Sequence, residues 1–312
     1  MVLLIQYTLF FAAVLILVAL GGCFSEHSGI VNLGLEGIMV VGALAGALVL
    51  EFIPKSTSTA VIVLLVVLAA AGLGILYSVL LGVAAIHFNA DQTLVGTAMN
   101  MLATAVAAVI VSTVNLSINP DKPSTSLTYT ANQPVLTFKI GNFEANWFML
   151  IALIAVILAY VILYKTRFGL RLRACGENPQ AADSVGINVY KMRWAGVLIS
   201  GLLGGIGGIA YITAGSTWDF VTGVSGYGFL ALAVMIFGEW KPLRIAVGGL
   251  LFGFFRALGS VHSGIAFLAA LNIPASVYNM LPYIVCLIVL IFSSKNSAAP
   301  KAEGIPYDKG SR

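Results

Sequence analysis

Residues 61–86, VIVLLVVLAAAGLGILYSVLLGVAAI, form an uninterrupted apolar stretch without a charged side chain. A helix of about 20 apolar residues crosses the hydrocarbon core of a bilayer, so this stretch predicts a membrane-spanning helix. The whole chain of 312 residues is 9% charged, with a mean hydropathy of +1.01, whereas soluble proteins are about 25% charged. This composition excludes a water-soluble enzyme, a secreted disulfide scaffold and a nucleic-acid-binding protein.

Apolar segments of this kind recur along the chain and predict an all-α polytopic integral membrane protein with about nine transmembrane helices, within a range of eight to ten. Because hydrocarbon offers no hydrogen-bond partners, each segment is expected to be helical or, if broken, packed inside protein. The segments cover approximately residues 3–22, 28–50, 59–88, 92–115, 146–164, 194–214, 226–238, 245–262 and 277–293.

Lys and Arg between the segments predict the orientation, because cytoplasmic connections are enriched in both residues. If residues 165–193 face the cytoplasm, that side collects twelve basic residues: Lys165, Arg167, Arg171, Arg173, Lys191, Arg193, Lys241, Arg244, Lys295, Lys301, Lys309 and Arg312. The other side keeps Lys55, Lys122 and Lys139, and Arg256 falls inside a segment and is not assigned. The N-terminus is therefore predicted outside and the C-terminus inside.

This topology divides the chain into a transmembrane domain, residues 1–294, and a disordered cytoplasmic tail, residues 295–312. Within the domain, residues 116–145 form an extracytoplasmic loop, in which TYTANQPVLTFKI (128–140) predicts a small β-hairpin around an Asn-Gln-Pro turn. The isolated Cys23, Cys175 and Cys286 lack metal-ligand spacing, so we expect free thiols and no metal site.

The cytoplasmic segment 165–193 contains a well-marked short helix. Asn178 can cap the free amides of a helix, and Pro179 at the first helical position loses no hydrogen bond. Gly186 supplies a stop. The sequence therefore predicts a helix of about two turns from Pro179 to Val185, with a face of small residues at Ala181 and Ala182, held at the membrane surface by basic flanks.

Three blocks of sequence resemble one family of transporters. GLRLRACGENPQAADSVGINV (169–189) is similar to the cytoplasmic coupling segment of ATP-binding-cassette (ABC) importer permeases of the branched-chain amino acid, ribose and nucleoside group. Within that group, SEHSGIVNLGLEGIMVVGA (25–43) looks like the pattern of the simple-sugar and nucleoside permeases. A third block, GYGFLALAVMIFGEWKPL (226–243), matches the same group, in the same order along the chain.

The resemblance implies a permease subunit of an ABC importer in a prokaryotic cell membrane, which translocates a small polar solute. Nucleosides, above all purine nucleosides, are the expected cargo, and simple sugars are the alternative. The implied partners are a second permease subunit in a heterodimer, a cytoplasmic ABC ATPase and an extracytoplasmic solute-binding protein or lipoprotein. The residues that would rest on the ATPase are Gly176, Glu177, Asn178, Pro179, Ala181, Ala182 and Gly186.

The chain has no G-x-x-x-x-G-K-[ST] motif, so we expect no cofactor and no catalytic residues on it, and place ATP and Mg²⁺ on the partner ATPase. Asn32, Glu36 and Asn100 are polar residues inside predicted spans. They are candidates for the translocation path, and the alternative is that they form interhelical hydrogen bonds that fix packing. Asn32 lies four residues before Glu36 and would share its helical face.

Two other functions compete with a permease. Gly223-Val224-Ser225-Gly226 resembles the nucleophile motif of rhomboid intramembrane serine proteases, with His262 on the same side in this topology. A gradient-driven secondary transporter would also explain the missing nucleotide motif, but Glu36 has no counterpart in the second half of the chain. Glycines four residues apart, Gly42 with Gly46, Gly201 with Gly205 and Gly204 with Gly208, predict close helix crossings.

Overall fold

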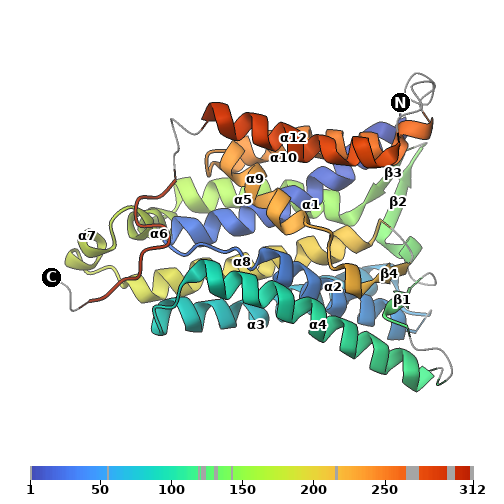
Figure 1. Ribbon diagram of the computed structural model, residues 1–312, viewed down its shortest axis with the longest axis horizontal. Helices are drawn as coiled ribbons and strands as arrows, with labels where there is room; N and C mark the ends of the chain where they lie inside the picture. Colours follow the sequence, from blue (N-terminus) through green and yellow to red (C-terminus); the bar gives the residue numbers. More distant parts are fainter. Residues whose placement is uncertain are drawn as a thin grey trace.

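The helices follow the apolar segments of the sequence, and short strands lie in loops at one end of the molecule (Figure 1). The computed structural model describes residues 2–54, 56–118, 120, 124–129, 133–141, 143–214, 217–264, 274–293 and 299–309. The long elements are α1 (Val2–His27), α2 (Leu35–Phe52), α3 (Thr59–Gly82), α4 (Gln92–Ile118), α5 (Trp147–Lys165), α6 (Arg167–Glu177), α7 (Pro179–Ser184), α8 (Val189–Ile212), α9 (Tyr227–Phe237), α10 (Pro242–Val261) and α12 (Ala275–Ser293). The short elements are η1 (Val83–His87), η2 (Gln133–Leu136), η3 (Phe220–Thr222), η4 (His262–Gly264), β1 (Ser126–Thr128), β2 (Thr137–Ile140), β3 (Phe143–Asn146) and β4 (Thr217–Asp219).

Seven of the described helices are long and apolar enough to cross a membrane: α1, α2, α3 continued by η1, α4, α5, α8 and α10. The prediction of an all-α polytopic membrane protein is therefore confirmed. The segment 226–238 forms α9, which has only 11 residues. Such a helix rises about 16 Å, roughly half the thickness of the hydrocarbon core. The last segment, 277–293, forms α12, a helix of 19 residues that contains Pro282.

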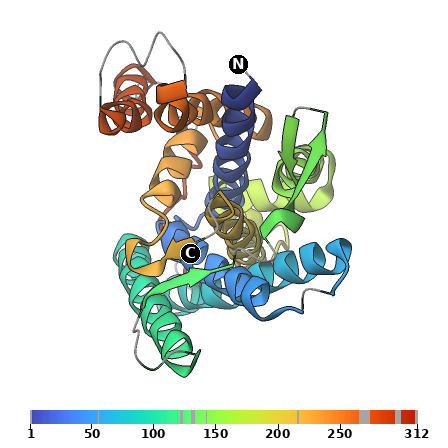
Figure 2. The ribbon, with the colours of Figure 1, turned by 90° about the vertical axis from the view of Figure 1, so that its right-hand side faces the viewer.

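The helix α1 packs against α5, α8, α9 and α10 (Figure 2). Every residue from Phe10 to Glu26 is buried, as expected for a helix that is apolar on all sides. Its neighbour α8 packs against α1, α2 and α3 through glycines. A Cβ atom on Gly205 would overlap the carbonyl of Ala70 in α3, and one on Gly208 would overlap the carbonyl of Met39 in α2. The predicted close crossings at Gly205 and Gly208 are confirmed.

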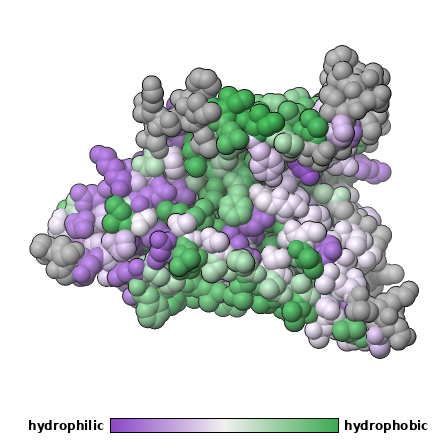
Figure 3. All heavy atoms as spheres, in the orientation of Figure 1, coloured by the Kyte–Doolittle hydropathy of each residue, from purple (hydrophilic) through white to green (hydrophobic). Residues whose placement is uncertain are grey.

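The two ends of the molecule differ in chemistry. Helix α1 begins at the end that carries the strands, and residues 299–309 lie at the opposite end, beside α6 and α7 (Figure 1). Hydrophilic residues gather over α6 and α7, and hydrophobic residues cover the flanks over α3, α4 and α12 (Figure 3). This arrangement fits a bilayer around the flanks and water at the α6–α7 end.

The loop 116–145 contains a hairpin, but not where the sequence predicted it. Strands β2 and β3 pair antiparallel, with Ile140 opposite Phe143, so the turn includes Gly141. Gly141 has φ 63°, a left-handed conformation that favours glycine. The predicted turn at Asn-Gln-Pro is wrong, because Gln133–Leu136 forms the helical turn η2 instead. Strand β1 pairs with β4 from a distant part of the chain.

The glycine packing of α8 predicts the effect of a single substitution. Replacing Gly205 with Leu should lower the free energy of unfolding by about 3 kcal/mol or prevent folding, because the side chain meets the backbone of α3. Gly72→Leu in α3 is the matched control, since its Cβ would meet nothing within 4 Å. Thermal denaturation in detergent compares the two variants, and equal melting temperatures would contradict the crossing.

Candidate functional site

The segment 165–193, which the sequence predicted to face the cytoplasm, contains two short helices, α6 and α7. The Asn178 side chain accepts a hydrogen bond from the Ala181 amide at 3.0 Å, and Pro179 occupies the first position of α7. The helix ends at Ser184, one residue before the predicted Val185, and Gly186 follows with φ 83°. The predicted start and stop of this helix are therefore confirmed, because local capping chemistry determines both.

The residues predicted to contact an ATPase lie on two sides of this segment. Glu177, Asn178, Ala181 and Gly186 are exposed, whereas Gly176, Pro179 and Ala182 are buried. Ala182 is only 3% exposed and packs with Cys175, Val189 and Tyr307. Val185, which the sequence did not single out, is 74% exposed at the end of α7. The small residues therefore do not form one outward face: Ala181 points out and Ala182 points into the protein.

The chain near its end covers the inner side of this segment. The Ala302 amide donates to the Gly176 carbonyl at 2.8 Å, and the Gly304 amide donates to the Gly29 carbonyl at 3.1 Å. The Arg193 guanidinium donates to the Ile305 carbonyl at 2.8 Å. We call residues 299–309 the C-terminal strap. The prediction of a disordered tail is wrong for these residues, because backbone hydrogen bonds and buried side chains hold them; residues 295–298 and 310–312 lie outside the described part.

Burial raises the pKa of two groups at the C-terminal strap, the Cys175 thiol and the Glu303 carboxyl. Tyr307 is 3% exposed and packs edge-on against Tyr190, with ring centroids 5.5 Å apart. Burial raises the pKa of the Cys175 thiol to about 11. Burial also raises the pKa of the Glu303 carboxyl, which shares a hydrogen bond with Glu26. Cys175, like Cys23 and Cys286, is a free thiol, as predicted.

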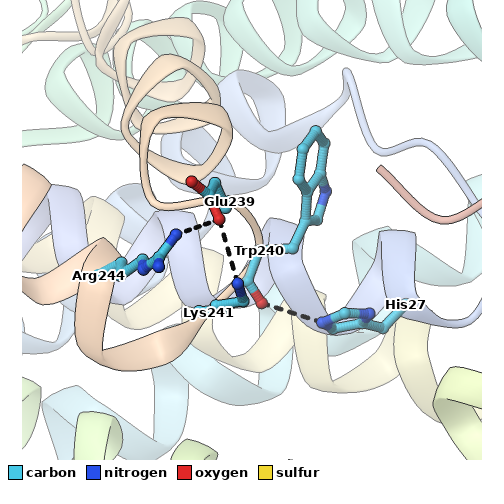
Figure 4. Close-up of polar contacts among 5 residues, drawn as sticks. All are labelled: His27, Glu239, Trp240, Lys241 and Arg244. Carbon is cyan, nitrogen blue, oxygen red and sulfur yellow. Dashed lines mark hydrogen bonds and ion pairs between the residues drawn. The ribbon is translucent and has the colours of Figure 1, made fainter. Parts of the chain in front are cut away.

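The turn between α9 and α10 joins the end of α1 to the same region. The Trp240 indole donates to the Glu26 carboxylate at 2.5 Å, and the Trp240 carbonyl lies 3.0 Å from a ring nitrogen of His27 (Figure 4). Glu239 in this turn pairs with Lys241 and Arg244 (Figure 4), and the hydrogen bond from Lys241 lowers the pKa of its carboxyl. Glu26 and Trp240 were not among the predicted site residues.

Glu36 connects α2 to the beginning of α9. One carboxylate oxygen accepts a hydrogen bond from the Gly226 amide at 2.7 Å, and the other accepts one from the Gly228 amide at 2.6 Å. The cap residue Gly226 makes no side-chain cap of its own. A negative charge is stabilised at the free amides of a helix N-terminus. Glu36 thus forms the interhelical contact that the sequence offered as one of two alternatives.

Asn100 and Asn32 both stabilise the chain that precedes α2. From α4, the Asn100 side chain accepts from the Gly37 amide at 2.8 Å and donates to the Leu33 carbonyl at 2.9 Å. Asn32 is fully buried and donates to the Ser200 hydroxyl at 2.8 Å. Because α2 begins only at Leu35, Asn32 is not helical, and the prediction that it shares a helical face with Glu36 is wrong.

Arg256, which the charge count left unassigned, lies within α10 in an aromatic cluster. Its guanidinium donates to the Tyr227 hydroxyl and lies 5.4 Å from the ring centroid of Phe11. Tyr211 packs against Tyr227 with centroids 4.1 Å apart. Tyr227 is the first residue of α9, so this cluster and Glu36 meet at the same helix end. A lone Arg in an apolar segment was the available signal in the sequence.

The protease alternative requires Ser225 and His262 to act as a pair. Ser225 has φ 55° in the turn before α9, and its side chain shares a hydrogen bond with Tyr211. The His262 ring stacks on Tyr278 at 5.1 Å, and its Nδ1 lies 2.9 Å from the Gly259 carbonyl. These contacts give each residue a partner other than the one that a nucleophile and base would need.

Known proteins similar to this chain are membrane permeases. The family described as "branched-chain amino acid transport system / permease component" matches residues 4–292. The guanosine ABC transporter permease protein NupQ of Bacillus subtilis strain 168 is 42% identical over 98% of this chain and 96% of its own length. The nucleoside ABC transporter permease protein NupC of Lactococcus lactis is 40% identical over 96% and 95%, and the putative glucose permease protein TsgC13 of Haloferax volcanii is 30% identical over 79% and 74%. No solved structure matches the chain.

Fold and similarity together define a multi-pass integral membrane protein of a prokaryotic plasma membrane, built as the permease subunit of an ABC transporter. The chain belongs to the branched-chain amino acid transport system permease family, as its three sequence blocks indicated. A rhomboid protease or a gradient-driven transporter is thereby disfavoured.

The contact at Glu36 predicts a loss of stability on neutralisation. Glu36→Gln replaces one acceptor oxygen with an NH₂ group that faces an amide, and should lower the free energy of unfolding by about 2 kcal/mol. Glu51→Gln makes the same chemical change near the other end of α2 and should have little effect. Thermal denaturation in detergent measures both, and an equal shift for the two variants would refute the capping role.

The C-terminal strap predicts how Cys175 reacts. With its raised pKa and full burial, the thiol should react slowly with a maleimide at pH 7.5 in the intact protein. Removing residues 299–312 uncovers it, and its labelling rate should rise at least severalfold, while buried Cys23 stays unreactive. Mass spectrometry follows each thiol, and Tyr307→Ala is a milder second variant. Unchanged Cys175 labelling in both would show that the strap does not cover it.

Proposed function

We propose that this chain is the membrane-spanning subunit of an ABC importer for nucleosides, with purine nucleosides as the first choice. The observation that carries the proposal is its 40–42% identity, over nearly the full length, to two permeases named for guanosine and nucleoside transport. Simple sugars are the second candidate, supported by the more distant glucose permease TsgC13 at 30% identity.

The proposed energy source is a separate cytoplasmic ATPase, which holds ATP and Mg²⁺, because the chain has no phosphate-binding loop. The surface that would rest on it is the exposed side of α7 and its flanks, with Glu177, Asn178, Ala181 and Gly186. Val185 adds a 74% exposed aliphatic side chain to this surface. Gly176, Pro179 and Ala182 act from beneath, by holding α7 against the rest of the protein.

Movement of α7 would reach the membrane helices through short, buried contacts. Gly176 lies against the His27 carbonyl at the end of α1, and α1 is buried along most of its length. A rigid element that is tightly packed shifts as a unit rather than deforming. Closure of the ATPase would therefore turn α1 and the α9–α10 turn together, and would change access to the pore.

In the proposed orientation the α6–α7 end faces the cytoplasm, with about nine crossings, the N-terminus outside and the C-terminus inside. The basic residues support it, since Lys165, Arg173, Lys191, Arg193 and Arg244 belong to the α6–α7 end or to helix ends beside it. A solute-binding protein or lipoprotein would dock at the end that carries the strands. A second, non-identical permease chain would supply the other half of the pore.

Asn32, Glu36 and Asn100 have different roles in this proposal. Asn100 and Glu36 shape the translocation path by fixing the beginnings of α2 and α9. Asn32 has one carbonyl oxygen, Oδ1, that is buried without a hydrogen bond in the described part of the chain. Such an oxygen is costly unless it gains a donor, so we place Asn32 nearest to a passing polar solute.

One experiment tests both cargo and coupling. A strain without nucleoside uptake, supplied with the chain and its ATPase, second permease and binding protein, should take up labelled guanosine. Excess unlabelled adenosine should reduce this uptake by competition, and excess ribose should not. Val185→Arg should abolish uptake and co-purification of the ATPase, because a charged side chain disrupts a docked surface. Ile305→Arg, at a 54% exposed position on the strap, is the matched control and should retain both.

Competition by ribose alone would overturn the nucleoside assignment in favour of a sugar. Retention of the ATPase by Val185→Arg, with normal uptake, would remove α7 as the docking element while leaving the cargo assignment intact. The two failures are therefore separate results of the same assay.

A further inference from the structure

Two cavities lie one after the other in the gap between α5 and α10. The first, of about 430 Å³, has almost entirely apolar walls, formed in part by Leu153 and Val156 of α5 and by Ala246 and Leu250 of α10. The second, of about 330 Å³, lies at the end of the same two helices near α6, between Tyr160, Tyr164 and Lys165 on one side and Lys241 and Arg244 on the other.

The two cavities follow one another along the same two helices, and together we call them the groove. Val156 of the first and Tyr160 of the second are four residues apart on α5, and therefore lie on consecutive turns of one face. Pro242 of the second cavity and Ala246 of the first, also four residues apart, make the same connection on α10. The groove is thus apolar along the membrane-crossing part of both helices, and becomes aromatic and basic where they reach the polar end.

The polar end of the groove carries an excess of positive charge. Lys165, Lys241 and Arg244 border it, and Arg173 stacks over the Tyr164 ring at 4.7 Å. Against these four cations stands Glu239, which pairs with Lys241 and Arg244 (Figure 4). The Lys241 and Arg244 side chains remain 46% and 54% exposed, so both can reach a ligand. The Nε atom of Arg173 is buried without a hydrogen bond in the described part of the chain.

We propose that this groove binds an anionic phospholipid. An acyl chain lies in the apolar cavity between α5 and α10, Tyr160 and Tyr164 lie at the level of the ester groups, and the phosphate contacts Lys165, Lys241 and Arg244. Tyr is favoured at this depth because its ring is apolar and its hydroxyl is polar. Basic pockets between membrane helices suit acidic head groups, since each cation near the surface adds to the attraction.

Charge complementarity favours a lipid over other occupants. A second copy of this chain on the same surface would bring two basic rims together, which is repulsive. A free phosphate would satisfy the cations but leave the 430 Å³ apolar cavity unfilled. A zwitterionic lipid would fill that cavity without neutralising the excess charge. The site is separate from the candidate residues of the translocation path, because Asn32, Glu36 and Asn100 do not line either cavity.

Native mass spectrometry of the purified full chain in detergent tests the proposal, with phosphatidylglycerol and phosphatidylcholine of identical acyl chains as probes. The intact protein should retain phosphatidylglycerol preferentially. The double variant Lys165→Gln, Arg244→Gln should bind it about tenfold more weakly, with phosphatidylcholine unchanged. The matched control Arg171→Gln, Lys191→Gln removes two exposed cations from the same end of the molecule and should bind as the intact protein does.

Further variants and competitors keep each result decisive. Ala246→Phe should weaken both lipids, because it fills the apolar cavity, and Lys165→Gln alone should give a smaller loss of phosphatidylglycerol if the double variant does not fold. Equal retention of the two lipids by the intact protein, or an equal loss in the control variant, would overturn the proposal. Displacement of the lipid by inorganic phosphate would indicate an anion site only, and a shift to dimers without bound lipid would identify a second copy as the occupant; both would also overturn it. Nucleoside uptake is not measured, so failure here leaves the proposed transport untouched.

Discussion

The carboxylate of Glu36 holds the first turn of α9 against the first turn of α2, and the centre of the membrane part depends on this contact. An unpaired carboxylate at the middle of a bilayer costs about 2.5–3.5 kcal/mol on insertion scales. Two hydrogen bonds to a charged acceptor contribute roughly 1.5–3 kcal/mol each, which is enough to offset a cost of this size. The contact also gives a partner to the free amides in the first turn of this 11-residue apolar helix.

The three sequence blocks that resemble the family meet in space. In block 25–43, Glu36 accepts hydrogen bonds from Gly226 and Gly228 of block 226–243, and Glu26 accepts one from Trp240 of the same block. Gly176 of block 169–189 lies against His27 of block 25–43. These contacts therefore connect α6 to the end of α1, to the α9–α10 turn and to the start of α9. In the proposed mechanism this line of contacts carries the movement of the ATPase to the pore.

What could be predicted from the sequence was decided by local chemistry. Asn178, Pro179 and Gly186 mark the ends of α7 through their own backbones, and the glycines of α8 reveal close packing by their missing side chains. Predictions that required distant contacts were less successful. Ala182 turns inward because Tyr307, far along the chain, packs with it.

The C-terminal strap was missed for a related reason. Its polar composition is that of a disordered tail. The hydrogen bonds that hold it are made largely by backbone groups of Ala302, Gly304 and Ile305, and amino-acid composition does not predict backbone hydrogen bonds of this kind. The helical position predicted for Asn32 was wrong, because the apolar pattern favoured a continuous helix there. The Gln92 side chain accepts from the Val31 amide, and the Asn100 side chain donates to the Leu33 carbonyl; both bonds stabilise non-helical backbone before α2.

The strap also imposes an order on biogenesis. Residues 299–309 leave the ribosome after every described helix, yet they complete the packing beneath Gly176 and Cys175. Until they arrive, the underside of α6 and α7 remains uncovered and its hydrogen-bonding groups remain hydrated. A nascent or prematurely terminated chain therefore presents an incomplete α6–α7 surface, and in the proposed mechanism an ATPase could engage this surface only after residues 299–309 have been synthesised.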